Sequence, residues 1–404
     1  VSVPERKHGE EVLDTILKQC GGIPVIVCSD AEDAGGGLVR RGAQADPFGL
    51  GSDLPMLSFY NKEDLPECKR QIKEYVSCAA GVADIELTGV DLNHGEGRAI
   101  QVFARRAEGA GATLSQLGGH SAEKTLRVEV RDSEGRGTRS VVAKIGDRPR
   151  IKREANKVRT MATRLPPDLM IGQADIVIAG AARKGGVFYG FADRYDRNVF
   201  TCLSGDEAAA CSAVDALMHG FSALHSNAVV APKRFSMLRR DIVGSDGLVN
   251  SGQLEGKIRD LDDLEMLTSS CIQHGDLHGE NILVDRLGKP VLIDYAKTAN
   301  ACGCLDAITL ELSAVFHPGA QAGRGAWPSV AQMSAWADLD SFVIGCPYPE
   351  FIKTVRNWAL GVAESQQEIE AVALAYVLRQ LRYSEDIRPL ALAFAESTQQ
   401  RLAS

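Results

Sequence analysis

The sequence predicts an α+β protein made of three consecutive parts. Residues 1–84 alternate helix-like and strand-like patterns, and residues 88–195 are dominated by strands and turns. Residues 196–404 are dominated by helical spacing of apolar side chains, interrupted by one short hairpin. Such changes in the period of the pattern predict different packing layers, so we place the domain boundaries at these positions.

Composition excludes several classes of protein. The chain has 404 residues, of which 45% are hydrophobic and 24% charged, with a net charge of -8. These values are typical of a globular protein of two or three domains, and the acidic balance argues against nucleic-acid or anionic-lipid partners. No apolar run approaches the ~18 residues of a membrane span, and the N-terminus lacks a signal-peptide pattern. The chain begins at Val1 rather than Met, as expected of a piece of a longer protein.

Cysteine usage predicts a cytoplasmic protein. The ten cysteines are scattered along a long chain, which is typical of reduced thiols rather than of a disulfide framework. The tightest pair, Cys302 and Cys304, has no second pair at metal-binding spacing, so we expect no structural zinc site.

The first part predicts α/β packing. Its apolar strands alternate with helices, and the last helix has Asp64 as a candidate N-cap. The predicted elements are a helix over 10–18, a strand over 23–28, a helix-like turn over 38–41, a strand over 55–60 and a helix from 64 to about 78.

These elements resemble the second half of a response-regulator receiver domain. The resemblance makes 23–28 the fourth strand, 56–60 the fifth, and Lys62 the phosphate-sensing lysine, although Glu63 replaces the usual proline. The phosphate-accepting aspartate of that family would lie upstream of Val1. The resemblance therefore implies no phosphotransfer by this segment, and the alternative is a docking or spacer subdomain that binds a protein partner.

The second part predicts a hairpin followed by a helix. Alternating runs over 125–131 and 140–145 flank a glycine-rich turn, and 149–161 has helical spacing with Glu154 as its only acid. Two further strands are expected over 175–180 and 185–191.

The hairpin within the helical part carries the chemistry. Asn281 precedes the strand 282–284, and Asp294 follows the returning strand 291–293, with a tight turn at Gly288. Antiparallel pairing brings the two polar side chains together at the open end, where two oxygen ligands suit Mg²⁺. Asp276 lies one short loop earlier and could reach a substrate hydroxyl near the same metal, as phosphoryl transfer from ATP requires.

The pattern His274-Gly-Asp276…Asn281…Asp294 resembles the protein-kinase-like superfamily, in its aminoglycoside phosphotransferase and choline kinase branch. The resemblance implies a bilobal kinase-like fold with a β-rich small lobe and a helical large lobe. It assigns Asp276 as the catalytic base, Asn281 and Asp294 as magnesium ligands, and His274 to the catalytic loop, more as a buttress than as a reacting group.

Nucleotide-binding residues follow from the same resemblance. Lys144, in Val-Val-Ala-Lys, corresponds to the lysine that grips the phosphates of ATP, and Glu154 is its expected ion-pair partner. The glycine-rich stretch with Gly118, Gly119 and Ser121 occupies the phosphate-loop position. It is not a Gly-x-Gly-x-x-Gly loop, and an ordinary turn is the alternative.

Departures from the protein-kinase pattern favour a small-molecule acceptor. Gly275 replaces the arginine of His-Arg-Asp, no Ala-Pro-Glu follows, and the metal loop reads Asp294-Tyr-Ala. The helix expected from Leu305, with Asp306 as its cap, resembles the kinase-like ternary complex associated domain of bacterial conflict and signalling systems. Arg379, Arg382 and Arg388 are interpreted as surface charge.

Two functions remain open at this point. One is an ATP- and Mg²⁺-dependent phosphotransferase acting on a hydroxyl-bearing small molecule. The other is a catalytically weak or inactive kinase-like signalling or scaffold module that binds nucleotide or a partner protein. The sequence does not name the acceptor.

Overall fold

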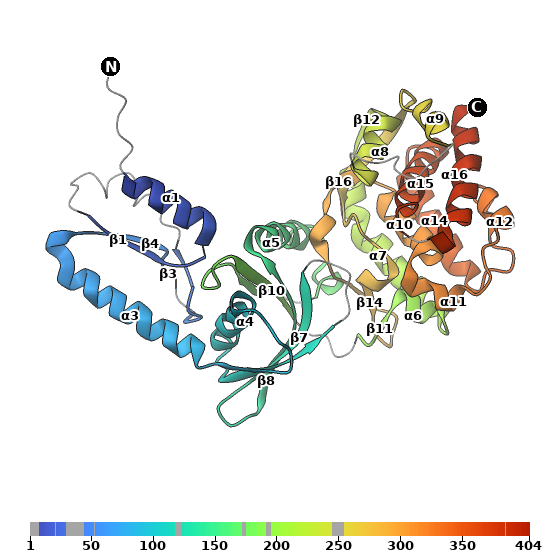
Figure 1. Ribbon diagram of the computed structural model, residues 1–404. Coiled ribbons are helices and arrows are strands. Elements are labelled where there is room, and N and C mark those ends of the chain that lie inside the picture. The colour runs from blue at the N-terminus through green and yellow to red at the C-terminus, as the bar shows by residue number, and fades with distance from the viewer. Residues whose placement is uncertain are drawn as a thin grey trace, which may run out of the picture. The chain divides into compact units, whose positions relative to one another are not determined.

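A computed structural model describes residues 8–20, 22–29, 44–51, 53–117, 123–171, 175–190, 195–244, 254–383 and 385–404. The chain divides into two compact units (Figure 1). The first unit comprises Val1–Asn156 and Gly172–Phe191, and the second comprises Lys157–Ile171 and Ala192–Ser404. Helices and strands occur in both, which confirms the α+β class. No helix within the described ranges is long and apolar enough to cross a membrane.

The N-terminal segment of the first unit is a small α/β arrangement. Strands β1 (Val25–Ser29) and β4 (Leu57–Asn61) pair in parallel, as the short apolar runs predicted, and they run between α1 (His8–Cys20) and α3 (Leu65–Ala83) in Figure 1. Asp64 occupies the predicted N-cap position of α3, although its side chain makes no capping hydrogen bond. Short elements complete the segment: β2 (Gln44–Ala45), β3 (Leu54–Pro55) and η2 (Lys62–Asp64). The helix-like turn expected over 38–41 lies outside the described residues.

A six-stranded sheet forms the rest of the first unit, in the order β5-β6-β7-β8-β10-β9. The strands are β5 (Glu86–Thr88), β6 (Gly111–Gln116), β7 (Lys124–Arg131), β8 (Gly137–Asp147), β9 (Asp175–Val177) and β10 (Lys184–Gly190). The predicted hairpin is confirmed as the antiparallel pair β7 and β8. The helix expected after it is confirmed as α5 (Arg148–Ala162), whose last residues belong to the second unit. Within the described part of this sheet, β5 and β6 pair in parallel and the other neighbouring strands are antiparallel.

One helix of this unit contradicts the strand-and-turn interpretation of its sequence. Helix α4 (His94–Arg106) connects β5 to β6. It starts with a capping box in which Asn93 and Glu96 exchange side-chain and backbone hydrogen bonds. Its Phe103 ring stacks on Phe188 of β10 at 4.0 Å between ring centroids. An apolar helix face packed in this way covers the sheet and closes its core.

The hydrophobic core is continuous between the sheet and the N-terminal segment. Phe48, Tyr75 and Val82 belong to the same buried cluster as the sheet residues. Arg105 of α4 donates to the Cys78 carbonyl of α3 at 2.6 Å. The two predicted domains of this region therefore share one core, and the boundary between residues 84 and 88 stays a prediction.

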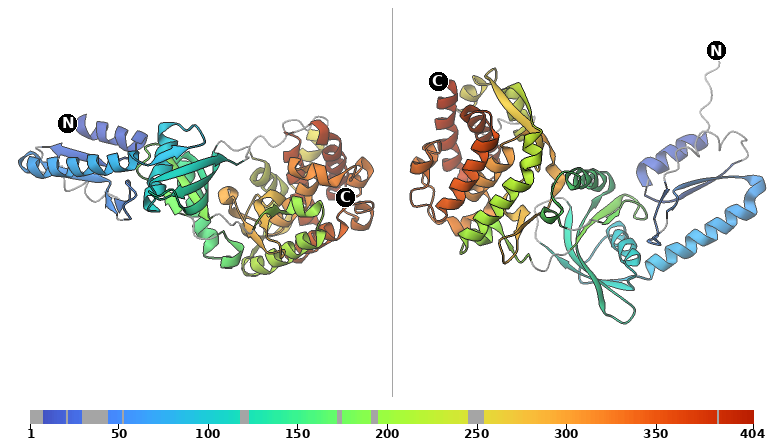
Figure 2. Two further views of the ribbon diagram at one scale, coloured as in Figure 1. Left: turned by 90° about the horizontal axis from the view of Figure 1, so that it is seen from below. Right: turned by 180° about the vertical axis from the view of Figure 1, so that it is seen from behind.

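The second unit is mostly helical. Its helices in chain order are η3 (Pro167–Leu169), α6 (Val199–Leu203), α7 (Glu207–Ser226), α8 (Phe235–Val243), α9 (Leu254–Arg259), η4 (Gly279–Asn281), η5 (Tyr295–Lys297), α10 (Leu305–Phe316), η6 (Pro318–Ala320), α11 (Gln321–Arg324), α12 (Val330–Ser334), α13 (Leu339–Phe342), α14 (Pro349–Val362), α15 (Gln366–Gln380), η7 (Glu385–Ile387) and α16 (Arg388–Ala403). Every residue of α10 is buried, so this helix lies at the centre of the unit. Figure 2 shows the orange and red C-terminal helices packed together in both views.

Two small sheets interrupt these helices, where the sequence predicted one hairpin. The predicted hairpin is present as β14 (Ile282–Val284) and β15 (Pro290–Leu292). A third strand, β11 (Arg197–Asn198), pairs with β14 on the side away from β15. The second sheet has the order β12-β13-β16, from β12 (Val229–Arg234), β13 (Glu265–Gln273) and β16 (Ala299–Cys302). The nine cysteines that the structure describes are free thiols, including the buried Cys302 and Cys304.

Candidate active site

The hairpin of the second unit places Asn281 and Asp294 at one end. Ile282 pairs with Leu292 in an antiparallel register, and the Ile293 amide donates to the Asn281 carbonyl at 3.0 Å. Asp294 follows directly, with a left-handed backbone at φ 58°. Its carboxylate accepts a hydrogen bond from the Ala296 amide at 3.3 Å. The two oxygen-bearing side chains thus lie on the strand ends where the sequence located them.

Hydrogen bonds fix the orientation of the Asn281 amide. Its Nδ2 donates to the Asp276 carbonyl at 2.9 Å and lies 3.1 Å from His278 Nε2. Burial lowers the pKa of His278 to about 4, so at neutral pH this ring is uncharged and its Nε2 can accept. Both hydrogens of Nδ2 are engaged, which leaves the amide oxygen of Asn281 as the atom that can bind a cation.

Asp276 lies between two cations. Its Oδ2 is 2.8 Å from Lys297 Nζ and its Oδ1 is 3.7 Å from Arg379 Nη2. Burial would raise the pKa of Asp276, but the charge and hydrogen bond of Lys297 lower it, and the charge of Arg379 acts in the same direction. The net effect is a pKa below the usual value, so the group is a carboxylate at neutral pH. Arg379 has only 18% of its side chain exposed, and its interpretation as surface charge is wrong.

The register of the second sheet explains why Lys297 reaches Asp276. Gln273 pairs with Ala299 in the antiparallel strands β13 and β16, so residues just after 273 lie beside residues just before 299. Gly275, with φ +80°, lies where these two segments come close together. A Cβ at this position would lie 2.5 Å from the Lys297 carbonyl oxygen. A glycine is required here both by the backbone conformation and by the close approach.

Asp306 holds the backbone of the loop that carries Asp276. Its carboxylate is completely buried and accepts from the amides of His274 at 2.6 Å and Gly275 at 2.8 Å. The N-cap of α10 is Cys304, so the predicted capping role of Asp306 is wrong. Burial raises the pKa of Asp306. The side chain anchors the backbone next to Asp276.

His274 is buried beneath the same loop. Its Nε2 lies 2.9 Å from the Ile293 carbonyl, and its ring packs on Tyr295 at 5.3 Å between centroids. These contacts connect the loop that carries Asp276 to the strand end that carries Asp294. The geometry is that of a buttress, because the ring is 0% exposed and has no access to a reacting group.

The first unit contains the predicted lysine and its partner. Lys144 of β8 lies 3.2 Å from Glu154 of α5, measured between Nζ and Oε2, and both residues are buried. The Tyr189 hydroxyl donates to the other carboxylate oxygen of Glu154 at 2.8 Å. The glutamate therefore holds the lysine at a defined place on the sheet. Gly118, Gly119 and Ser121, the predicted phosphate loop, lie outside the described residues.

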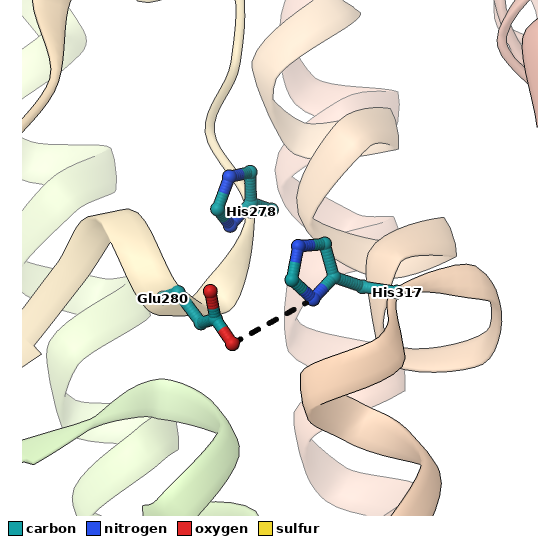
Figure 3. A group of neighbouring side chains, drawn as sticks. All are labelled: His278, Glu280 and His317. Atoms are coloured by element: carbon teal, nitrogen blue, oxygen red, sulfur yellow. Dashed lines mark ion pairs between the residues drawn. The ribbon is translucent and has the colours of Figure 1, made fainter. Parts of the chain in front are cut away.

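A second cluster of polar side chains includes residues that lie next to Asp276 in the chain. His278, Glu280 and His317 have ligand atoms within 4.8 Å of one another, and Figure 3 shows Glu280 directed toward His317. The two imidazole rings stack with centroids 4.4 Å apart at 21°. Because imidazole lone pairs lie in the ring plane, stacked rings do not direct them to one point. This arrangement is that of a packing group rather than of a coordination sphere.

Comparison with known proteins gives only remote similarities. No protein-family model matches the chain, and no curated protein matches its sequence. Among solved structures, an aminoglycoside phosphotransferase APH(4)-Ia mutant is 13% identical with a TM-score of 0.44, over 72% of this chain and 95% of that one. Amicoumacin kinase, solved with AMP-PNP and Ca²⁺, is 12% identical with a TM-score of 0.42, over 71% and 88%. A putative fructosamine-3-kinase from Haemophilus somnus is 11% identical with a TM-score of 0.42, over 77% and 98%. At these values the similarities do not by themselves assign an activity.

Proposed function

We propose that the chain is an ATP- and Mg²⁺-dependent phosphotransferase that acts on a hydroxyl group of a small molecule. The observation that carries this proposal is the placement of Asp276, Asn281 and Asp294 around one end of the β14–β15 hairpin. Asp276 is ionised, anchored by its backbone and placed to accept the hydrogen of an acceptor hydroxyl. Phosphoryl transfer needs little more than such a group, a metal clamp and phosphate-binding cations.

The donor set fits magnesium. The amide oxygen of Asn281 and the carboxylate of Asp294 are hard oxygen ligands, and few protein ligands are typical where phosphates and water complete the coordination. A bound Mg²⁺ would neutralise phosphate charge. The buried pair of Lys144 and Glu154 in the first unit supports the same interpretation, since a glutamate-positioned lysine can bind the phosphates of ATP.

We further propose a two-lobed kinase-like architecture, with residues 88–195 as the small lobe and 196–404 as the large lobe. The parallel pairing of β1 and β4 supports a receiver-like origin for residues 1–84. A protein partner for that segment, and a role in a bacterial signalling or conflict system, are part of the same proposal.

The alternative is a kinase-like module without turnover. It is favoured by one observation: Lys297 already forms an ion pair with Asp276 at 2.8 Å. A carboxylate occupied in this way must exchange partners before it can accept a hydroxyl proton. The alternative predicts nucleotide binding, or only partner binding, with no transfer.

Thermal unfolding with ATP, with and without Mg²⁺, tests the proposal and separates it from the alternative. A ligand that binds only the folded state raises the melting temperature, so Mg²⁺-dependent stabilisation is expected for the wild type and lost in Asp294→Ala, which removes the ligand oxygens. Asp276→Asn should keep the stabilisation but lose ADP formation with a panel of hydroxyl compounds. Asp263→Asn, at a side chain that is 92% exposed, is the matched control. Stabilisation without ADP formation in the wild type would favour the alternative, and no stabilisation at all would refute nucleotide binding.

A further inference from the structure

The two carboxylate oxygens of Asp276 face cations from different parts of the second unit. Lys297, beside Oδ2, belongs to η5, which begins directly after the proposed metal ligand Asp294. Arg379, whose Nη2 lies 3.7 Å from Oδ1, belongs to α15, a helix that follows the hairpin much later in the sequence. The two sides of the carboxylate are thus chemically distinct: one adjoins the metal-binding end and the other adjoins the C-terminal helices.

Arg379 has hydrogen-bonding capacity that its protein contacts do not use. Its distance of 3.7 Å to Asp276 is too long for a hydrogen bond, and its buried Nε has no hydrogen-bond partner. The guanidinium lies 5.2 Å from the Tyr376 ring centroid, which orients the side chain. The same side chain is hydrogen-bonded to the Tyr376 hydroxyl, so the donor that remains without a partner is Nε. A buried donor without a partner is costly, and an acceptor atom of a ligand would satisfy it.

Arg356 of the same unit shows what a structural arginine looks like here. Its Nε and Nη2 donate to both carboxylate oxygens of Glu311 at 2.7 and 2.5 Å, and its Nη1 donates to the Trp336 carbonyl at 3.2 Å. Arg197 and Arg239 also have a buried Nε without a partner, but each forms a short ion pair, at 2.6 Å with Asp206 and 2.7 Å with Asp262. Arg379 differs from these arginines because its ion pair with Asp276 is longer, at 3.7 Å, which leaves its charge less fully engaged by the protein.

We propose that the acceptor carries an anionic group, a carboxylate or a phosphate, close to the hydroxyl that is phosphorylated, and that Arg379 binds this group. The inference rests on the proposed function and names the substrate class of the same site. A hydroxyl bound at Oδ1 of Asp276 places its neighbouring atoms beside Arg379, where a carboxylate or phosphate can pair with the guanidinium. An ammonium group there would face a like charge, so amino-sugar acceptors are disfavoured.

Arginine side-chain NMR tests anion binding directly. In the full chain labelled with ¹⁵N-arginine, the Nε–H signal of Arg379, assigned through Arg379→Gln, is followed during titration with inorganic phosphate and with acetate at constant ionic strength. A saturable shift of this signal is expected for both anions, and sodium chloride should produce none. Arg382→Gln, at an exposed arginine two residues beyond α15, should leave the shift unchanged.

Binding of phosphate measured by calorimetry supplies the second readout. Affinity should fall about tenfold or more in Arg379→Gln, because a guanidinium–anion pair is lost, and should be unchanged in Arg382→Gln. No saturable shift with either anion, or equal affinity in Arg379→Gln, would overturn the inference while leaving Mg²⁺-dependent nucleotide binding intact. Anion binding at Arg379 without any nucleotide binding would instead refute the proposed function, and the acceptor assignment with it.

Discussion

Removing the Asp306 carboxylate should destabilise the second unit and disorganise the loop that carries Asp276. In Asp306→Ala, the amides of His274 and Gly275 lose their acceptors at 2.6 and 2.8 Å. Each buried amide left without a partner costs about 1–3 kcal/mol, so the two together cost about 2–6 kcal/mol. Part of this loss of stability is offset, because the variant no longer buries a carboxylate. Burial opposes the ionisation of Asp306 and raises its pKa, so keeping this group inside the protein has a cost of its own. We expect a net loss of about 2–4 kcal/mol in the free energy of unfolding.

Tryptophan fluorescence isolates the relevant unit. All three tryptophans of the chain lie in the second unit: Trp327, Trp336 and Trp358. Urea unfolding followed by their emission therefore reports this unit without interference from the first. A loss below about 1 kcal/mol in Asp306→Ala would contradict the reasoning. So would an equal loss in Asp215→Ala, at an exposed position on α7, where a change within about 0.5 kcal/mol is expected.

Asp306→Asn refines the test. The asparagine side chain keeps one acceptor oxygen for one of the two backbone amides, but it turns an NH₂ group toward the other. About half of the loss in unfolding free energy should therefore remain. If the proposed function holds, ADP formation should fall further in Asp306→Ala than in Asp306→Asn, since the backbone beside Asp276 is less restrained. Equal activity in both variants and the wild type would show that the anchor does not affect the site.

Three further predictions concern buried polar groups. Burial raises the pKa of Glu368 to about 7 from 4.5, so the folded state retains a proton that the unfolded state has lost between these pH values. Its contribution to stability should thus decline by about 3 kcal/mol as pH rises from 4.5 to 7, a slope that Glu368→Gln should lack in urea unfolding across this range. Arg356→Met should cost about 3–5 kcal/mol by the fluorescence assay, because Glu311 is left buried without its partner, and a cost under 1 kcal/mol would contradict this. Tyr189→Phe removes the hydrogen bond to Glu154 and should cost about 1 kcal/mol in the first unit by calorimetry, with no change in the tryptophan transition.

Local signals predicted several elements correctly. The apolar runs became β1 and β4, the alternating runs became β7 and β8, and the hairpin at 282–292 formed in the expected register. Helix α4 was missed although its capping box at Asn93 is a local feature of the sequence. Strands β12, β13 and β16 were missed because each depends on partners more than 25 residues away in the chain.

The sequence by itself determined that Asn281 and Asp294 lie at one end of the hairpin, and its resemblance to the kinase-like superfamily predicted the pairing of Lys144 with Glu154. The first follows from a short-range rule, because a tight turn brings its strand ends together. Tertiary structure alone decided the surroundings of Asp276. Lys297 reaches it through the pairing of β13 with β16, Asp306 through the first turn of α10, and Arg379 from α15. Contacts between residues so far apart in the chain depend on how the whole unit packs, and no local period encodes them.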